Sequence, residues 1–503
     1  MFYPTFQQME RFVAEGYNFI PIGIKQKITS FEPIKLYEKV KEGAEAHFIF
    51  ESGKIGLYTY LAANPLLIVK GKNGNVTSQD RSGESIEHTG NPLVILMEIM
   101  AKYQAPAIPE LPKFYGGAVG YLSYDMARYF ERLPNMADDD LSIPDLYFML
   151  IDKLWVYDQH EEELYYIEHL QVNSTNQLKV EFQNKLHNIQ EVWNKTLKEV
   201  NWQASVQEEI TENQPQQINR ADIATSFTRD EFIQAVEKIQ EYIAAGDVFQ
   251  VNLSVRQSRT LKTDSLNIYQ HLRKINPSPY MGYLHFAELQ LVSSSPELLI
   301  EVNYGKIQTR PIAGTRPRGL SEEEDQKNIT ELLNNEKEVA EHIMLVDLER
   351  NDLGRVSKYG TVEVNELMAI EKYSHVIHIV SNVVGELAPG KDLYDCIKAT
   401  FPGGTITGAP KIRTMEIIEE LEPVRRGPYT GSMGWISFQG NLELNILIRT
   451  MIVKEGKGYL QAGAGVVIDS IPENEFIESL NKAEAIWRAV ESSEQANKGE
   501  QTS

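Results

Sequence analysis

The order of helical and strand-like segments restricts the folds open to this chain. Thr228 and Glu231 have the spacing of a capping box, and the apolar residues that follow at helical spacing predict a helix that stops at Gly246. A strand is predicted directly afterwards, at 248–256. Later strand-like runs fall at irregular intervals between helices, at 291–295, 376–381 and 444–449. Because helix and strand do not alternate one for one, the pattern favours an α+β fold over a doubly wound sheet.

The strand predicted at 248–256 offers one face to a core and one to a site. Phe249, Val251, Leu253 and Val255 alternate with polar residues, so the four apolar side chains share one face. Gln250 belongs to the opposite, polar face. We therefore expect the apolar face to be buried and the polar face to be able to line a site.

The chain divides into unequal segments. Its 503 residues suggest about three domains by length alone, although the motifs described below favour fewer. Apolar residues at helical spacing from Leu178 to Leu197 predict a connector helix, and the stretch rich in Gln, Glu and Asn that follows it is the best linker candidate. We predict an N-terminal lobe at 1–160, a connector helix and linker at 161–226, a catalytic domain at 227–490 and a disordered tail at 491–503.

Charge and cysteine content exclude several classes of function. The formal net charge of -22 opposes binding to nucleic acid or to an anionic membrane surface. Cys396 is the only cysteine, so no disulfide can form within the chain, and a reducing compartment fits best. The N-terminus lacks the pattern of a secretory signal, and no apolar stretch approaches the ~20 residues that span a bilayer. These features predict a cytoplasmic protein.

Three motifs occur in a fixed order along the second half of the chain. They are RPIAGTRPR at 310–318, FPGGTITGAPK at 401–411, and QAGAGV at 461–466, which is followed by an acidic helical segment at 475–482. Each motif alone is weak, since Gly and Pro mark turns in any protein. In this order they resemble the chorismate-using enzymes, most closely the anthranilate synthase component I family. The resemblance implies a large α+β chorismate-binding fold of orthogonally packed antiparallel sheets flanked by helices, with the N-terminal lobe built onto it.

The same resemblance implies an activity and a pathway. Enzymes of this family convert chorismate and ammonia to anthranilate and pyruvate, the first committed step of tryptophan biosynthesis. Two other readings stay open at this point. One is aminodeoxychorismate synthase component I, of the folate pathway, and the other is a non-catalytic regulatory subunit that binds chorismate or tryptophan.

Two pairs of glutamates are candidates for a metal site. Glu338 and Glu341 are three residues apart on a predicted helix, and Glu475 and Glu478 repeat that spacing. Such pairs are ordinarily solvated helix faces. Mg²⁺, however, prefers oxygen ligands and commonly takes one or two carboxylates, with water and substrate oxygens completing its shell. The resemblance implies that Glu341 and Glu478 hold Mg²⁺, with Glu338 beside them.

Chorismate carries two carboxylates, which this acidic chain must offset locally. The resemblance places one at Mg²⁺ and the other at an arginine, a tyrosine and the amides of a glycine-rich strand, where small residues let N–H groups approach an anion. Taken alone, these residues could equally be a surface charge and a tight turn. The implied substrate-binding residues are Gly314, Thr315, Tyr429, Arg449, Gly463, Ala464, Gly465 and, with less support from the motif, Lys482.

Two residues are candidates for acid and base catalysis. Loss of a ring hydroxyl needs a proton donor, for which a buried carboxyl such as Glu297 is suited. Release of pyruvate needs removal of a ring proton, which the imidazole of His378 can perform near neutral pH. Alone, Glu297 would be a strand-end residue and His378 a core histidine. Both stand at positions that the family uses.

The nucleophile follows from what two positions lack. Enzymes that add water to chorismate resemble this chain but carry a lysine base where Gln250 stands, and an amide cannot deprotonate water. Aminodeoxychorismate synthases carry a motif that resembles PIKGT, with a lysine that acts as a covalent nucleophile. This chain has Ala313 in place of that lysine, so the covalent route is also missing. Ammonia needs neither group. Because Cys396 lies in an ordinary helical context rather than a nucleophile elbow, a separate glutamine amidotransferase subunit is expected to supply ammonia, giving a hetero-oligomer.

The N-terminal lobe carries a possible regulatory site. The segment 48–52 is similar to the element with which anthranilate synthases sense tryptophan, and 276–281 resembles its partner. By themselves these segments are a strand end and a turn. The resemblance implies tryptophan as an inhibitor, bound by Glu51, Ser52, Asn276, Pro279, Tyr280 and Met281.

Overall fold

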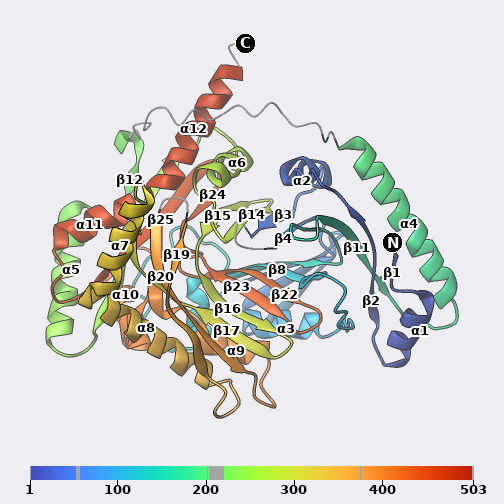
Figure 1. Ribbon diagram of the computed structural model, residues 1–503, viewed down its shortest axis with the longest axis horizontal. Helices are drawn as coiled ribbons and strands as arrows, with labels where there is room; N and C mark the ends of the chain where they lie inside the picture. Colours follow the sequence, from blue (N-terminus) through green and yellow to red (C-terminus); the bar gives the residue numbers. More distant parts are fainter. Residues whose placement is uncertain (1, 53–56, 201, 203–219, 374–375, 501–503) are drawn as a thin grey trace.

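The computed structural model describes residues 2–52, 57–200, 202, 220–373 and 376–500. Within these ranges the chain forms two large antiparallel sheets surrounded by helices, as Figure 1 shows. The two sheets run through both halves of the chain. The predicted α+β class is therefore confirmed.

The first sheet joins N-terminal strands to strands of the second half through the pairing of β3 with β14. Its pairings are antiparallel throughout. In spatial order it contains β1 (Phe2–Tyr3), β2 (Phe19–Lys27), β11 (Glu163–Gln171), β10 (Lys153–Asp158), β4 (Tyr58–Ala63), β3 (His47–Glu51), β14 (Tyr280–Phe286), β15 (Leu289–Ser295), β24 (Thr450–Lys454), β25 (Lys457–Val466), β13 (Gln250–Thr260) and β12 (Ala224–Thr225), with β21 (Gly408–Ala409) also on β13.

The second sheet is joined in the same way, by β8 against β22. In spatial order it contains β18 (Ile312–Pro317), β20 (Val376–Glu386), β17 (Lys306–Arg310), β16 (Leu298–Asn303), β23 (Leu442–Ile446), β22 (Ser432–Ser437), β8 (Gly117–Leu122), β9 (Leu146–Ile151), β5 (Leu67–Lys72), β6 (Asn75–Asp80) and β7 (Ser85–Thr89), with β19 (Glu363–Lys372) on β20. The N-terminal segment thus contributes strands to both sheets.

The helices lie around the sheets (Figure 1) and do not alternate one for one with the strands along the chain. Those of the N-terminal segment are α1 (Phe6–Ala14), α2 (Pro33–Val40), α3 (Pro92–Met100), the 3-10 helix η1 (Tyr124–Tyr129) and α4 (Leu178–Glu199). Those of the second half are η2 (Arg220–Asp222), α5 (Arg229–Ala244), α6 (Ser265–Ile275), α7 (Glu322–Asn334), α8 (Glu336–Gly354), α9 (Leu393–Thr400), η3 (Gly404–Ile406), α10 (Lys411–Leu421), α11 (Pro472–Asn481) and α12 (Glu484–Glu500). In the part of the chain that the structure describes, no helix combines the length and apolarity needed to cross a membrane.

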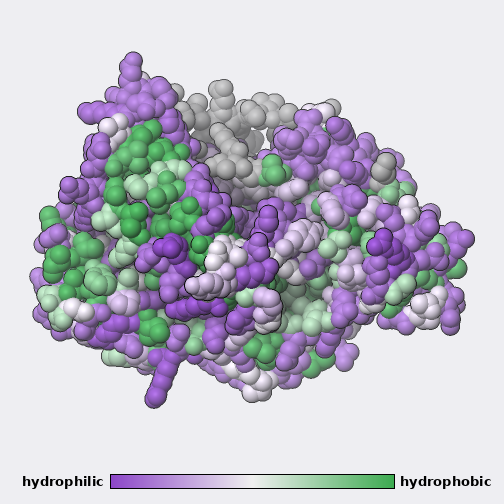
Figure 2. All heavy atoms as spheres, turned by 60° about the horizontal axis from the view of Figure 1, so that its bottom comes forward, coloured by the Kyte–Doolittle hydropathy of each residue, from purple (hydrophilic) through white to green (hydrophobic). Residues whose placement is uncertain are grey.

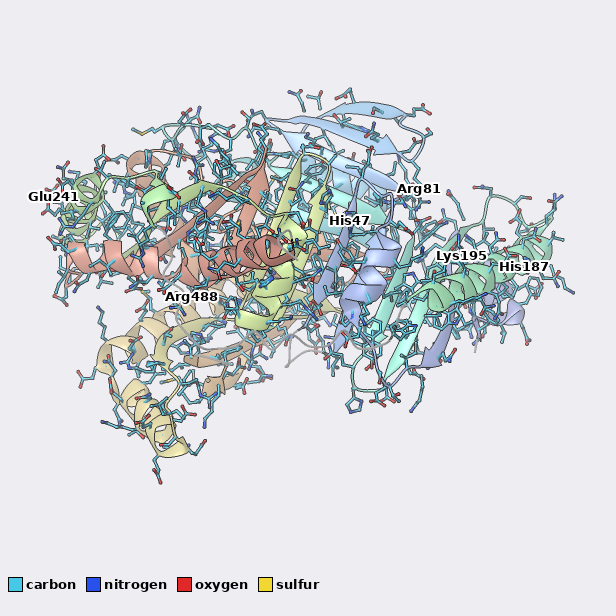
Figure 3. The ribbon with its side chains drawn as sticks, turned by 90° about the horizontal axis from the view of Figure 1, so that it is seen from above. His47, Arg81, His187, Lys195, Glu241 and Arg488 are labelled. Atoms are coloured by element: carbon cyan, nitrogen blue, oxygen red, sulfur yellow. The ribbon has the colours of Figure 1, made fainter. Side chains whose placement is uncertain are left out.

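Several local predictions are confirmed. The Thr228 hydroxyl accepts from the Glu231 amide, and the Glu231 carboxylate caps Thr228 in return, so α5 begins with the predicted capping box. The connector helix is α4, whose apolar stripe is buried through residues such as Phe182 and Trp193. Its outer residues, among them His187 and Lys195, are exposed at one edge of the molecule (Figure 3). Most of the predicted linker lies outside the described residues.

Two local predictions are wrong. Phe249 is 71% exposed instead of sharing the buried face of β13. The neighbouring strand β25 ends at Val466, opposite Val251, so nothing in that strand reaches far enough to cover Phe249. The predicted tail, 491–503, is helical up to Glu500. The reason is that the buried Arg259 forms ion pairs with Glu491 and Glu494 on α12, which holds this helix against the sheet.

A buried ion pair between Arg426 and Glu422 holds three elements of the second half of the chain together. The Arg426 guanidinium is 3% exposed, and it donates to Glu422 through Nε at 2.9 Å and Nη2 at 2.7 Å. It also donates to the carbonyls of Ile406 at 3.0 Å and Asn252 at 2.6 Å. Glu422 accepts in turn from the Ser254 amide at 2.9 Å. One pair of side chains thus connects β13, η3 and the end of α10.

We predict that Arg426→Met destabilises the fold by about 3–5 kcal/mol, because it leaves the Glu422 carboxylate buried without a partner. Denaturant unfolding followed by circular dichroism measures the change. The matched control is Arg488→Met, which removes an i,i+4 pair with Glu484 on the surface of α12 (Figure 3) and should cost less than about 1 kcal/mol. Equal losses in the two variants would contradict the role given to Arg426.

Candidate active site

Gln250, the first residue of β13, links two of the predicted site residues. Its side chain is 5% exposed, and Nε2 donates to Glu341 Oε1 on α8 at 2.8 Å. On the other side the amide lies against Gly465, where a Cβ atom would come within 2.3 Å of Gln250 Nε2. Glycine at 465 therefore leaves the space through which Gln250 reaches α8.

The glycine-rich segment of β25 has an open edge. From Val466 back to Lys457 the strand pairs with β13, but its ladder with β24 covers only 457–460. Residues 461–466 thus have no strand partner on that second side within these pairings. Gly463 is also tightly packed, since a Cβ there would lie 2.6 Å from the Leu253 carbonyl oxygen. Peptide groups that point to the open edge can bind an anion at close range.

Cationic side chains gather beside this edge. Lys482 Nζ donates to the Gly463 carbonyl at 3.1 Å and pairs with Glu478 at 2.8 Å. Arg449 Nη1 donates to the Lys482 carbonyl at 2.9 Å. The sequence predicted a strand that ends at Arg449, and this prediction is wrong. Strand β23 ends at Ile446, and Arg449 lies in the connection to β24 with a φ of 51°, a conformation found mainly in turns.

Tyr429 lies near Arg449 and keeps its phenolic proton. Burial raises the pKa of Tyr429 above its usual value, although the nearby guanidinium groups of Arg426 and Arg449 act to lower it. The Arg426 guanidinium stands 5.5 Å from the centre of the Tyr429 ring. Burial also lowers the pKa of Arg449. An anionic ligand would relieve that cost, because it would restore a charged partner to a desolvated arginine.

A bulge in β18 brings Thr315 to His378. Gly314 has a φ of +65°, and the register with β20 shifts between Ala313 and Thr315. Thr315 then pairs directly with His378, and its hydroxyl lies 3.1 Å from His378 Nδ1. Nδ1 is also 3.0 Å from the Gly314 carbonyl oxygen, which can only accept. The hydrogen therefore belongs on Nδ1, which leaves Nε2 with the lone pair of a base.

Burial raises the pKa of the Glu297 carboxyl to about 7. The residue is 4% exposed in the connection between β15 and β16, and its Oε1 has no hydrogen-bond partner. The Thr405 hydroxyl and the Ile312 amide lower the pKa, but less than burial raises it. Burial has the opposite effect on His378, whose pKa it lowers. Near neutral pH the pair thus offers a protonated carboxyl and a neutral imidazole.

The predicted magnesium ligands are each linked to the glycine-rich strand β25 but form no complete cage. Glu341 reaches Gly465 through Gln250, and Glu478 reaches Gly463 through Lys482. Among the described residues no three or more His, Cys, Asp or Glu side chains converge into a metal cluster. This donor set fits Mg²⁺ bound by two carboxylates and completed by water and a ligand's oxygens. Glu338 is less suited, because Arg316 Nη1 holds it at 3.1 Å.

The sequence of the chain matches a known family of enzymes. A family model described as chorismate binding enzyme matches residues 47–488, which is most of the chain. The chain belongs to this family. The predicted resemblance is therefore confirmed.

Two relatives align with this chorismate-binding enzyme along nearly its full length, and their names describe two different reactions. Aminodeoxychorismate synthase component 1 of Bacillus subtilis is 48% identical over 95% of this chain and 98% of that protein. Anthranilate synthase component 1 of Acetivibrio thermocellus is 43% identical over 98% of this chain and 99% of that protein.

Solved structures show the same fold. Anthranilate synthase component I of Streptococcus pneumoniae superposes with a TM-score of 0.73 and 36% identity, over 86% of this chain and 92% of that one. The isochorismate synthase MenF of Escherichia coli reaches a TM-score of 0.67 at 17% identity, over 96% of this chain and 98% of that one, which supports the fold alone.

The predicted regulatory residues of this chorismate-binding enzyme surround a small cavity of about 30 Å³. Its walls include Glu51, Ser52, Pro279, Tyr280 and Met281. The sixth predicted residue, Asn276, is not part of the wall and donates instead to Ser294 Oγ at 3.2 Å. Glu51 is occupied by Arg273, at 2.5 Å, and by the Tyr269 hydroxyl, at 2.6 Å. The cavity is also lined by Trp435, Met433 and Glu443, three residues that were not predicted from the sequence.

Sequence reasoning also missed a row of buried carboxyls behind Glu297. Glu349 and Asp352 lie on α8 and are 8% and 2% exposed. The available signal was two acidic residues three positions apart on a helix, the same spacing as in the pairs Glu338–Glu341 and Glu475–Glu478.

We predict that Gly465→Ala lowers turnover of chorismate by roughly 10–100-fold, the range for losing a partner that orients a functional side chain. The new Cβ would displace the Gln250 amide from its bond to Glu341. Initial rates and thermal unfolding, measured together, separate this effect from misfolding. In the control, Gly354→Ala, the Cβ meets open space at the end of α8, so the rate should not change. A similar rate loss in both variants would show that the contact does not matter.

Proposed function

We propose that this enzyme aminates chorismate and is the large subunit of an anthranilate synthase. In this reaction ammonia adds to the ring, the ring hydroxyl leaves as water, and pyruvate is eliminated. The observation that carries the proposal is the neutral amide of Gln250, which is buried and bonded to Glu341. An amide cannot activate water for attack, whereas ammonia is itself a sufficient nucleophile.

The substrate would lie between β25, α8 and α11. One carboxylate would be held by Arg449, Tyr429 and the open edge of 463–465, with Lys482 beside it. This cluster supports the proposal because it concentrates positive charge beside an unpaired strand edge within a chain whose net charge is -22. Without such local donors, a doubly anionic ligand would be repelled.

Mg²⁺ would be bound by Glu341 and Glu478, with Glu338 nearby. When present it would neutralise the second carboxylate of the substrate and help to orient the ring. Lys482 contacts Glu478 and Gln250 contacts Glu341, so each proposed ligand is already oriented by a neighbouring side chain.

Glu297 and His378 would act in two successive proton transfers. Glu297 is suited to give its proton to the departing hydroxyl, since burial keeps its pKa at about 7. His378 is suited to take the ring proton at Nε2, because the Gly314 carbonyl fixes the hydrogen on Nδ1. Thr315, which contacts His378 Nδ1, would help to hold the imidazole ring in place.

Ammonia would come from glutamine through a separate amidotransferase subunit. The sole cysteine, Cys396, is fully buried on α9, and burial raises the pKa of its thiol to about 12. A thiol in that state is not a nucleophile at neutral pH. The chain would therefore act as one part of a hetero-oligomer.

A second candidate is aminodeoxychorismate synthesis, which retains the enolpyruvyl group. It is favoured by the 48% identity to the Bacillus subtilis protein of that name. Ala313, in contrast, removes the lysine that the sequence analysis associates with this reaction. The product decides between the two candidates.

We predict that the chain, chorismate, Mg²⁺ and an ammonium salt yield fluorescent anthranilate, while glutamine alone gives no turnover. Glu297→Gln should lower the rate by about 10²–10⁴-fold, since the acid is lost without a large change in shape. In the unmodified chain, at a constant concentration of free ammonia, the rate should fall as pH rises through about 7, where Glu297 loses its proton. A product whose mass retains the enolpyruvyl group would establish the second candidate. Failure to use ammonia at all would contradict both.

We also propose tryptophan as an inhibitor that binds beside Glu51 and Ser52. The cavity of about 30 Å³ has room for little more than water, so Met433 and Trp435 would have to move to admit an indole. Ser52 lies at the rim, where its hydroxyl donates to the Tyr58 carbonyl at 2.9 Å.

We predict that tryptophan inhibits the unmodified chain and that Ser52→Phe raises the inhibitory concentration at least about tenfold, since the phenyl ring would block the cavity. An inhibition curve at fixed chorismate is the measurement. Ser82→Phe, in an exposed turn, is the control and should leave the curve in place. Lack of inhibition in the unmodified chain would refute the regulatory site.

A further inference from the structure

Three carboxyl groups form a buried row that starts at the candidate acid. Glu297, Glu349 and Asp352 are 4%, 8% and 2% exposed. Each has one buried oxygen without a hydrogen-bond partner, namely Oε1, Oε2 and Oδ1 respectively. The proposed reaction uses Glu297 and leaves the other two unexplained.

Glu349 is near enough to Glu297 for the two charges to interact, and α8 packs against η3 at this point. Leu348, the neighbour of Glu349 on α8, lies against Gly404, where an added Cβ would come within 2.0 Å of its Cδ2. The next residue of η3, Thr405, has its hydroxyl beside the Glu297 carboxyl. The buried hydroxyl of Thr309, on β17, faces Glu349.

The cation closest to this row is already engaged by Asp352. Lys411 Nζ lies 2.6 Å from Asp352 Oδ2 and 3.1 Å from the Thr400 carbonyl oxygen. Arg355, the residue that follows α8, also acts on Asp352. None of the ion pairs found among the described residues includes Glu297 or Glu349. If all three carboxyls were ionised, the two cations that act on Asp352 would leave Glu297 and Glu349 as buried negative charges without an ion-pair partner, which the interior does not tolerate.

The protonation of Glu349 follows from this arrangement. Burial raises the pKa of Glu349 well above its usual value, and the negative charges of Glu297 and Asp352 raise it further. The Thr309 hydroxyl and Lys411 lower it, but they do not cancel the effect of burial. Two neighbouring carboxyls of this kind titrate as a pair, so one proton stays while the other leaves.

We propose that Glu349 is a positioning residue for Glu297: it stays a neutral, protonated carboxyl directly behind the acid throughout the reaction. The proposal rests on the proposed function only in naming Glu297 as the acid. When the ring C–O bond breaks, the departing oxygen takes the proton of Glu297 and leaves as water. The buried row then gains a single negative charge. An ionised Glu349 would instead oppose that charge and hold the proton on Glu297.

The first test is the pH dependence of stability, which needs no substrate. If Glu349 is protonated when folded and ionised when unfolded, folding takes up a proton, and stability falls as pH rises above the unfolded pKa. Glu349→Gln removes this penalty while keeping the shape. The melting temperature of Glu349→Gln minus that of the unmodified chain should therefore increase steadily from pH 5 to pH 8.

A matched control is Glu419→Gln. Glu419 is 5% exposed but is ion-paired with Arg128 and accepts the amides of Met136 and Ala137. Its loss should lower the melting temperature and give no gain as pH rises. If Glu349→Gln behaves in the same way, Glu349 is ionised in the folded chain and the proposal is overturned.

The second test uses the rate of the reaction against pH. Glutamine imitates a neutral carboxyl. In Glu349→Gln the fall in rate near pH 7 should therefore occur within about 0.3 pH unit of the pH at which it occurs in the unmodified chain, even if the rate itself changes. If Glu349 were ionised, its removal would take a negative charge away from Glu297 and shift the fall to lower pH by one unit or more. Such a shift would overturn the proposal. The stability result stands even if the reaction proves to be a different one.

Discussion

The antiparallel pairing of β13 with β25 is the constraint on which the site depends. It sets Gln250 next to Gly465 and leaves an open strand edge where β24 no longer follows β25. The buried pair of Arg426 and Glu422 holds β13 against η3 and α10. A shift of register by one residue would turn Gln250 to the other face of the sheet and remove its contact with α8.

Local charge solves the problem of an acidic protein that binds an anion. The face of the molecule in Figure 2 is mainly hydrophilic, with apolar residues gathered at its upper left. At the site, however, Arg449 and Lys482 lie together beside the edge of β25 that has no strand partner in the ladder with β24. The surroundings of Glu297 differ in this respect. There, burial without nearby cations keeps Glu297 protonated near pH 7, and the neutral Glu349 proposed behind it would preserve that balance.

Much of this arrangement could be predicted from local pattern. The capping box of α5, the stripe of α4 and the burial of Cys396 follow from spacing and apolar periodicity, which act over a few residues. The exposure of Phe249 could not be predicted in this way, because it depends on where another strand ends. Nor could the helical end of the chain, since the reason for it is the buried Arg259 far away in sequence.

The sequence by itself determined the chemistry that is available: an amide at 250, alanine at 313, the two glutamate pairs and the family to which the chain belongs. Only the tertiary structure decided how those groups are used. The proton on His378 Nδ1, the bond between Gln250 and Glu341, the small cavity at Ser52 and the carboxyl row behind Glu297 all arise between segments remote in the chain. Their pKa values and contacts depend on burial, and burial is set by packing rather than by neighbours in sequence.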